Sequence, residues 1–445
     1  MQPIASAAQP LHIAPMNAHV PDRGGELVAA GRPLGIGPQW LAKLWAGGVQ
    51  RLLDRIDAGL QRGSIMATLP DGTTRVLGAR QAGFDAVVDL RSYRALLRLA
   101  TSGSVGWYQA WEAGEWASPD PVPLFALFMD NAASLGGAAR ARGPWRLAVR
   151  LLHKLRRNSR EGARRNIHLH YDLGNDFYTQ WLGATMLYSS AIFARPGDAP
   201  SPQSQFLSEL DVGQGNKLAA IDRRLALQAG ERVLEIGCGW GGLASFLAEQ
   251  RGVSVDAISL SDEQLEYARG RWVASEATID FRKQDYRDVA GTYDAVVSIE
   301  MVEAVGREYW GTFLDCIMRN LRPGGHAVLQ YITLRDDVFE SYAQSADFIQ
   351  TYIFPGGMLL NEPEFRRLAE ERGLAWEERH AFGQDYARTL ELWRAYFDEA
   401  VEEGRLPAGF DDRFVRLWRY YLMYCEGGFR GGGIDVAQVT LRKPA

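Results

Sequence analysis

Several features are scarce or absent in this sequence. Three cysteines in 445 residues (Cys238, Cys316 and Cys425) cannot build a disulfide framework, which favours a reducing compartment. No apolar run reaches the roughly 18 residues that a membrane-spanning helix needs. The first 25 residues lack a basic stretch followed by an apolar one, so we expect no secretory signal. We predict a disordered leader over residues 1–35.

What is present describes a folded protein of several domains. Hydrophobic residues make up 47% of the chain and aromatic residues 11%, which excludes a wholly disordered protein. The length suggests two or three domains at roughly 150 residues each. His168 and His170 lie close together, but no cysteine or acidic cluster completes a metal site of recognisable spacing, so none is predicted.

The charge is unevenly distributed. The whole chain carries a net charge of −5, yet residues 140–165 hold ten basic residues against the single acid Glu161. That segment therefore carries +9 and the rest of the chain −14. We predict a basic amphipathic linker over residues 139–166, and a basic island on an acidic chain suggests an anionic surface as partner.

Periodicity places one domain on each side of this linker. Residues 36–138 combine helical spacing with short strands and predict a small α+β domain. From residue 232, apolar strands alternate with helices, which predicts an α/β domain with a doubly wound, parallel sheet over residues 167–445. Helices over 362–371 and 390–424 follow.

The sharpest local signal is a glycine loop between a strand at 233–236 and a helix at 242–249. Gly237, Gly239 and Gly242 satisfy the spacing for a dinucleotide and also that for S-adenosylmethionine (SAM). Asp256 lies about where NAD would need an acid for its ribose, but in mid-strand rather than at a strand end. Glycine spacing alone therefore leaves both cofactors open.

Two further features favour SAM. Glu235 stands two residues before the first glycine, where a carboxylate suits a cationic amino-acid ligand rather than a pyrophosphate. Asp285 and Tyr286 form an acid–aromatic pair after the next apolar run, suited to an adenine amino group and ring face. The sequence thus predicts SAM as the cofactor.

Seven ordered motifs resemble one family, the cyclopropane-fatty-acid synthases and relatives that methylate double bonds of acyl chains. The resemblance spans about residues 63–441. The motifs are HYDLGN at 170–175, MLYSS at 186–190, VLEIGCGWGG at 233–242, QDYRD at 284–288, SIEMVE at 298–303, YIFPGG at 352–357 and GQDY at 383–386. The resemblance implies a Rossmann-like SAM methyltransferase sheet with a smaller, lipid-binding-like N-terminal domain and acyl-binding helical additions.

The resemblance also implies site residues. Those expected to contact SAM, together with Glu235, are Tyr188, Ser189, Gly237, Gly239, Ser259, Leu260, Gln264, Asp285 and Tyr286. Members that form cyclopropanes hold bicarbonate as the base, and here Glu303, Tyr386 and the backbone of Ile332 match that set. Ser190 and Gln330 replace its cysteine and histidine. Both can donate to an anion, but neither titrates near neutrality as histidine does, so a bicarbonate site is altered or lost.

These departures resemble the subgroup that makes methyl- or methylene-branched fatty acids. The expected reaction is methyl transfer to the double bond of an unsaturated acyl chain, through a carbocation. A branched product is preferred and a cyclopropane is the alternative. The expected partners are an unsaturated acyl phospholipid at a membrane surface, a reductase acting on the product and a second copy in a homodimer. The expected location is cytoplasmic, peripheral on the inner membrane face.

Other functions stay open at this stage. A nucleic-acid methyltransferase would use the basic island for phosphates, but residues 298–301 carry no aromatic–proline catalytic tetrad, so no nucleic-acid partner is expected. A small-molecule methyltransferase is a further alternative. A non-catalytic lipid-transfer protein would not need the glycine loop or Glu303.

Overall fold

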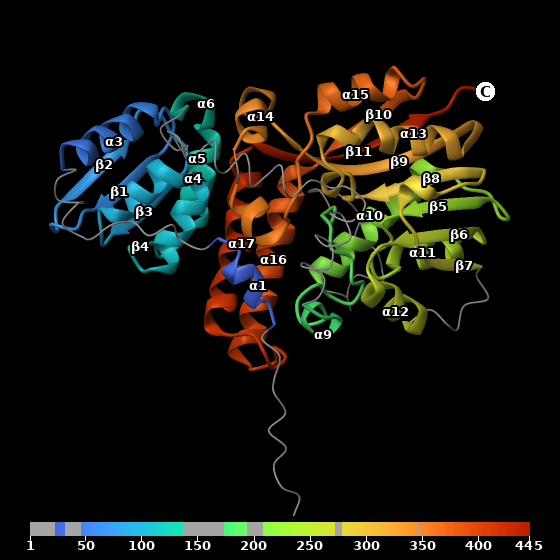
Figure 1. Cartoon of the computed structure of the whole chain (residues 1–445), viewed down its shortest axis with the longest axis horizontal. Coiled ribbons are helices and arrows are strands. Elements are labelled where there is room, and N and C mark those ends of the chain that lie inside the picture. Colours follow the sequence, from blue (N-terminus) through green and yellow to red (C-terminus); the bar gives the residue numbers. More distant parts are fainter. Residues whose placement is uncertain (1–22, 32–45, 137–172, 194–207, 272–277, 346) are drawn as a thin grey trace, which may run out of the picture.

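A computed structural model describes residues 23–31, 46–136, 173–193, 208–271, 278–345 and 347–445 (Figure 1). The basic linker, His168, His170 and most of the leader lie outside these described residues. Two sheets form the body of the molecule, and a pair of long helices stands between them. No helix within the described ranges is long and apolar enough to cross a membrane.

The N-terminal domain is built on a four-stranded sheet in the order β2-β1-β3-β4. Alternation along β1 explains its two faces: Ile65 and Ala67 are buried against helices, whereas Met66 is exposed. The strands are β1 (Ser64–Thr68), β2 (Thr74–Gly78), β3 (Asp85–Leu90) and β4 (Trp116–Ala117). The helices are α3 (Ala46–Gly59), α4 (Arg94–Glu112), α5 (Val122–Asp130) and α6 (Ala132–Leu135). This is the α+β domain that the sequence predicts.

The larger domain carries a seven-stranded sheet in the order β10-β11-β9-β8-β5-β6-β7. Its strands are β5 (Arg232–Ile236), β6 (Ser254–Ser259), β7 (Ile279–Lys283), β8 (Tyr293–Ile299), β9 (Leu321–Leu334), β10 (Ala375–Ala381) and β11 (Ile434–Arg442). β11 runs antiparallel to both neighbours, so the sheet is mixed rather than wholly parallel as expected. The last strand, β11, inserts between β9 and β10. β10 is polar and largely exposed, so it has no apolar run from which it could be predicted.

Both faces of this sheet are covered by helices. Val233 of β5 packs into one apolar cluster with α10 (Glu209–Leu225), α11 (Gly242–Arg251) and α12 (Asp262–Arg271). Its neighbour Leu234 packs into a second cluster with α13 (Trp310–Asn320) and α15 (Glu362–Glu370). Successive strand residues point to opposite faces, so the apolar run of β5 is buried on both sides. The doubly wound α/β prediction is confirmed.

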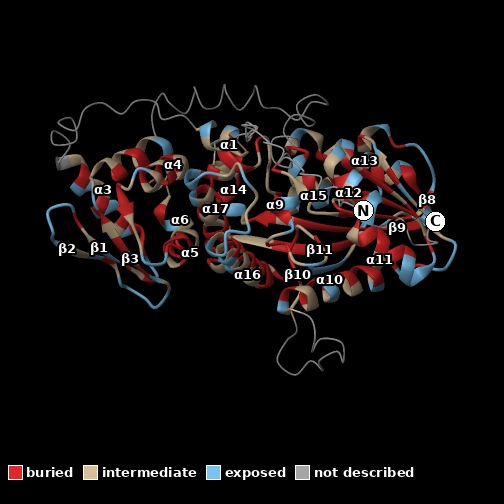
Figure 2. Ribbon diagram, turned by 90° about the horizontal axis from the view of Figure 1, so that it is seen from below, coloured by how far each residue is buried: buried red, intermediate tan, exposed pale blue. Residues whose placement is uncertain are grey.

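Two antiparallel helices, α16 (Gly383–Glu402) and α17 (Asp412–Arg430), stand between the two sheets in Figure 1. The expected single helical stretch over 390–424 is therefore two helices. α17 begins where the Asp411 side chain accepts a hydrogen bond from the Phe414 amide. In Figure 2, α5 lies beside α17 and α6 near α14 (Asp336–Ala343), so the N-terminal domain docks on these additions.

Part of the expected disordered leader is a helix. Residues 25–29 form α1 (Gly25–Ala29), which packs on α17. Arg23 is ion-paired with Asp176 in the short helix α9 (Asn175–Tyr178). The carbonyl of Gly31 accepts hydrogen bonds from Gln109 of the N-terminal domain and from the hydroxyl of Tyr352. This segment is ordered because both domains contact it, which its own composition does not reveal.

Candidate active site

A cavity of about 170 Å³ lies at the carboxyl ends of β5, β6 and β8. The glycine loop forms one wall, where Gly237 (φ 87°) and Gly239 (φ 52°) take a left-handed backbone that favours glycine. The amides of Gly237 and Cys238 donate to the carbonyl of Ile258 at 2.9 and 3.0 Å, which fixes the loop to β6. Ligands of open α/β sheets bind at this edge.

Nearly all residues expected to contact SAM line this cavity. They are Tyr188, Ser189, Glu235, Gly237, Gly239, Ser259, Leu260, Gln264 and Tyr286. Asp285 does not line it, and its carboxylate receives two hydrogen bonds from the Arg287 side chain at 2.8 and 2.6 Å. Asp256 lies away from it in mid-β6 and accepts a hydrogen bond from the hydroxyl of Tyr293, so the NAD alternative has no ribose ligand there.

Glu235 tests whether the cavity suits SAM. Its Oε2 is buried without a hydrogen-bond partner in the described part of the chain. Burial raises the pKa of this carboxyl to about 8, against one stabilising hydrogen bond from the Ala244 amide. A buried, unsatisfied carboxylate that lines a cavity fits a cationic ligand, because a nearby positive charge restores its ionised form. The ammonium group of SAM supplies such a charge, so the residues fit this cofactor.

A second, larger cavity of about 420 Å³ lies between the two domains. Helices α4, α5 and α6 supply one side, including Trp107, Phe125 and Ala132. Helices α16 and α17 and the segment 347–359 supply the other, including Phe354 and Phe429. An apolar cavity walled by aromatic and aliphatic side chains suits an acyl chain or another long apolar ligand.

Three residues line both cavities: Tyr188, Glu300 and Ala304. The Tyr188 hydroxyl lies 2.8 Å from that of Tyr421 on α17, which joins the loop before α10 to the helical additions. The cofactor cavity and the apolar cavity therefore meet at a common wall.

Glu300 is the central group of that wall. Its Oε1 accepts from the Ser190 amide at 3.0 Å and from Nε2 of Gln330 at 2.7 Å, and its Oε2 accepts from the Tyr386 hydroxyl at 2.7 Å. Removal from bulk water raises the pKa of Glu300, and these three donors and the nearby Lys217 oppose the rise. Three donors on one carboxylate favour its ionised form.

Glu303 has a different environment. Its Oε1 accepts from the Ile332 amide, whereas its Oε2 has no partner among the described residues. Burial and the nearby charge of Glu300 raise the pKa of Glu303 to about 8. The surroundings of these two adjacent carboxyls therefore differ: three donors favour the ionised form of Glu300, whereas the pKa of about 8 favours the protonated form of Glu303 near neutral pH.

The expected catalytic residues are thus brought together, but in an unexpected arrangement. Glu303, Tyr386 and Ile332 line the apolar cavity. Ser190 and Gln330 line neither cavity and are buried behind the wall. Their donors, with the hydroxyl of Tyr386, converge on Glu300 rather than on an open anion site.

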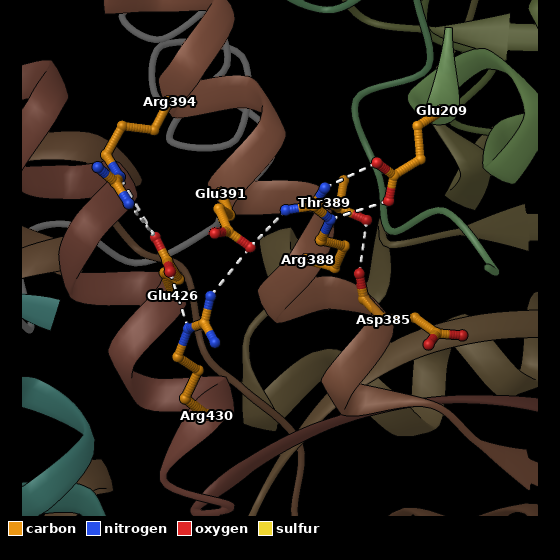
Figure 3. Close-up of polar contacts among 8 residues, drawn as sticks. All are labelled: Glu209, Asp385, Arg388, Thr389, Glu391, Arg394, Glu426 and Arg430. Carbon is orange, nitrogen blue, oxygen red and sulfur yellow. Dashed lines mark hydrogen bonds and ion pairs between the residues drawn. The ribbon is translucent and has the colours of Figure 1, made fainter. Parts of the chain in front are cut away.

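Helix α16 holds this arrangement in place. The Thr389 hydroxyl accepts from the Ala191 amide at 3.0 Å, next to Ser190, and donates to the Asp385 carbonyl at 2.7 Å. Figure 3 shows Arg388 on the same helix paired with Glu209 of α10. It also shows two ion pairs that join α16 to α17, Arg394–Glu426 and Glu391–Arg430. The loop at 190 and Tyr386 are therefore fixed relative to each other.

Two polar residues of the site escaped sequence reasoning, Glu300 and Lys217. Glu300 directly follows β8, a position at the binding edge of the sheet that could have marked it. Lys217 lies among apolar residues on the buried face of α10, an unusual place for a lysine, and donates to the Ser189 hydroxyl at 2.5 Å. Burial lowers the pKa of Lys217 to about 7, against the attraction of Glu300.

Comparisons with known proteins identify the family. The family model described as mycolic acid cyclopropane synthetase matches residues 158–439. The tuberculostearic acid methyltransferase UfaA1 of Mycobacterium tuberculosis is 36% identical over 358 residues, covering 77% of this chain and 80% of the relative. The cyclopropane-fatty-acyl-phospholipid synthase of Escherichia coli K12 is 37% identical over 276 residues, covering 62% and 66%.

A solved structure extends the comparison to the cofactor. The mycolic acid cyclopropane synthase CmaA1, crystallised with SAH and CTAB, matches with a TM-score of 0.57 and 29% identity, covering 63% of this chain and 98% of that one. SAH is the demethylated form of SAM, so the predicted cofactor is confirmed, as are the predicted family and the methyltransferase fold. This chain belongs to the mycolic acid cyclopropane synthetase family of SAM-dependent methyltransferases.

Proposed function

We propose that this chain methylates the double bond of an unsaturated fatty acyl chain carried by a phospholipid, and that the product is methyl- or methylene-branched. The observation that carries the proposal is the common wall of the two cavities at Tyr188, Glu300 and Ala304. An apolar chain in the larger cavity can approach the cofactor cavity at that wall. SAM, when bound in the cofactor cavity, would supply the electrophilic methyl group.

The residues of the chain provide what this chemistry needs. An alkene is a weak nucleophile, so it must be held in line and kept from water, which the apolar cavity provides. Methylation leaves a cation on the acyl chain, and the aromatic faces of Tyr188 and Tyr386 at the wall can stabilise it. A base must then remove a proton, and the choice of proton decides the product.

The preference for a branched product rests on the donors of Ser190, Gln330 and Tyr386. All three donate hydrogen bonds to Glu300, so they are not free to bind bicarbonate. Bicarbonate is the base that the family resemblance implies for cyclopropane formation. The name of the Mycobacterium tuberculosis relative, a tuberculostearic acid methyltransferase, supports the same preference. A methylene-branched product would then be saturated by a separate reductase.

The product itself is the direct test. Purified protein, methyl-labelled SAM and vesicles of an unsaturated phospholipid should yield labelled acyl chains. Cyclopropane and methylene products each add one CH2, so mass cannot separate them, whereas NMR of the methyl esters should show an exocyclic methylene group. A cyclopropane as the sole product would contradict the branched assignment. Label in RNA but not in lipid would contradict the function as a whole.

We also propose that the enzyme is a homodimer that works peripherally on the inner face of the cytoplasmic membrane. The basic linker would bind the anionic membrane surface. Each Lys or Arg near an anionic surface contributes about 1 kcal/mol. Replacing Arg156, Arg157, Arg164 and Arg165 by glutamine should weaken binding to anionic vesicles at least about tenfold in a sedimentation assay, with SAM affinity unchanged. The control replaces four exposed arginines elsewhere, including Arg366 and Arg367. If both sets weaken vesicle binding equally, the linker has no specific role in membrane docking.

A further inference from the structure

The wall between the cavities holds a carboxylate to which the resemblance gave no role. Glu300 directly follows β8, and its backbone is left-handed with φ 49°, an uncommon conformation for a glutamate. Such a conformation persists where the surrounding structure holds it, and it turns this side chain toward the junction of the two cavities. Glu300 is the one acidic residue in the described chain that lines both.

Three hydrogen bonds hold the Glu300 carboxylate in place and favour its ionised form. The Ser190 amide, Gln330 and Tyr386 come from three separate parts of the chain and all donate to it. Gln330 is itself oriented, because its Oε1 accepts from Nε2 of Gln438 on β11 at 3.0 Å, which turns its amide nitrogen toward Glu300.

We propose that Glu300 is the base that removes the proton from the methylated acyl cation. This inference rests on the proposed function. In this step a C–H bond of the cation breaks, its electron pair becomes the new carbon–carbon double bond, and the proton passes to an oxygen of Glu300. The cation becomes a neutral alkene and the carboxylate a carboxylic acid, so charge balances and no external anion is needed.

The neighbours of Glu300 support this assignment over Glu303. Glu303 has one donor and one unsatisfied oxygen, and its pKa near 8 leaves it largely protonated at neutral pH. Lys217, which attracts Glu300 electrostatically, lies on the cofactor side and can favour return of Glu300 to its ionised form after each turnover.

Two variants of Glu300 test the proposal in the full-length protein. Glu300→Gln preserves shape and removes the base, so turnover should fall at least about 100-fold with SAM affinity and melting temperature retained. Glu300→Gly suits the left-handed backbone and leaves space beside the three donors. Formate or bicarbonate should therefore restore its turnover at least about tenfold, but not that of Glu300→Gln. The original enzyme should be indifferent to both anions.

The controls separate this proposal from the proposed function. Glu340→Gln makes the same chemical change on the exposed face of α14 and should leave turnover intact. If the original enzyme methylates no acyl chain, the proposed function fails. If it does, three outcomes overturn the role of Glu300: a Glu300→Gln protein within threefold of the original, loss of SAM binding that accounts for the loss of turnover, or a Glu300→Gly protein that neither anion restores.

Discussion

Replacing Glu235 by glutamine should weaken SAM binding about 30-fold at pH 7.5. A hydrogen bond to a charged partner is worth about 3 kcal/mol at most, or about 100-fold in affinity, when the carboxylate is fully ionised. With a pKa of about 8, only part of the Glu235 population is ionised at this pH in the cofactor-free protein, which reduces the expected loss.

The pKa of Glu235 also predicts the direction in which SAM affinity changes with pH. SAM is cationic and favours the ionised carboxylate, so binding below pH 8 must release the proton of Glu235. Affinity of the original protein should therefore rise about 20-fold between pH 5.5 and 7.5, by about threefold over the first unit and about sixfold over the second. The Glu235→Gln protein has no proton to release, so its affinity should be flat and the two proteins should bind alike near pH 5.5.

Calorimetric titration in buffers of different ionisation enthalpy measures both affinity and proton release. Glu249→Gln is the matched control, because Glu249 lies exposed on α11 and outside the cavity. A flat affinity in the original protein, or the same slope in the glutamine variant, would show that Glu235 does not meet the cation.

A larger side chain on the N-terminal-domain wall of the apolar cavity should reduce turnover of an 18-carbon acyl chain about 30-fold. Ala132 on α6 lines this cavity, so a tryptophan there would occupy space that the substrate needs. Crowding of this kind costs about 2 kcal/mol. SAM affinity should stay unchanged, because Ala132 does not line the cofactor cavity.

The neighbouring residue provides the comparison. Ala133 is exposed on the same helix and outside the cavity, so Ala133→Trp adds the same side chain without narrowing it. Steady-state kinetics with acyl chains of 14, 16 and 18 carbons should show the longest chain most affected by Ala132→Trp. Equal kinetics for the two variants would mean that the acyl chain lies elsewhere.

The sequence allowed the cofactor site to be predicted because its signals are local. The loop from Glu235 to Gly242 is a strand, turn and helix in ten residues, and its spacing carries the chemistry. The mixed sheet was missed because β11 pairs with β9 across about a hundred residues and has no local mark of its direction. The α16–α17 pair was missed because both helices have apolar spacing, although the nine residues between them (403–411) include the helix-breaking Gly404, Pro407 and Gly409.

The role of Glu300 could not be predicted for a related reason. Its partners Ser190 and Tyr386 lie 110 and 86 residues away along the chain, so no spacing pattern joins them. The resemblance identified Ser190, Gln330 and Tyr386 as a set. It did not reveal that a carboxylate of the chain itself occupies the point on which they converge.

The position of the apolar cavity links ligand binding to the association of the two domains. α4 forms part of its wall and bends at Gly103, where Ser104 donates to Asp347 of the larger domain at 2.7 Å. A chain held between the domains contacts both, so each acyl group bound adds to the free energy that keeps them docked. Under the proposed function, the substrate is then a structural component of the interface between the domains.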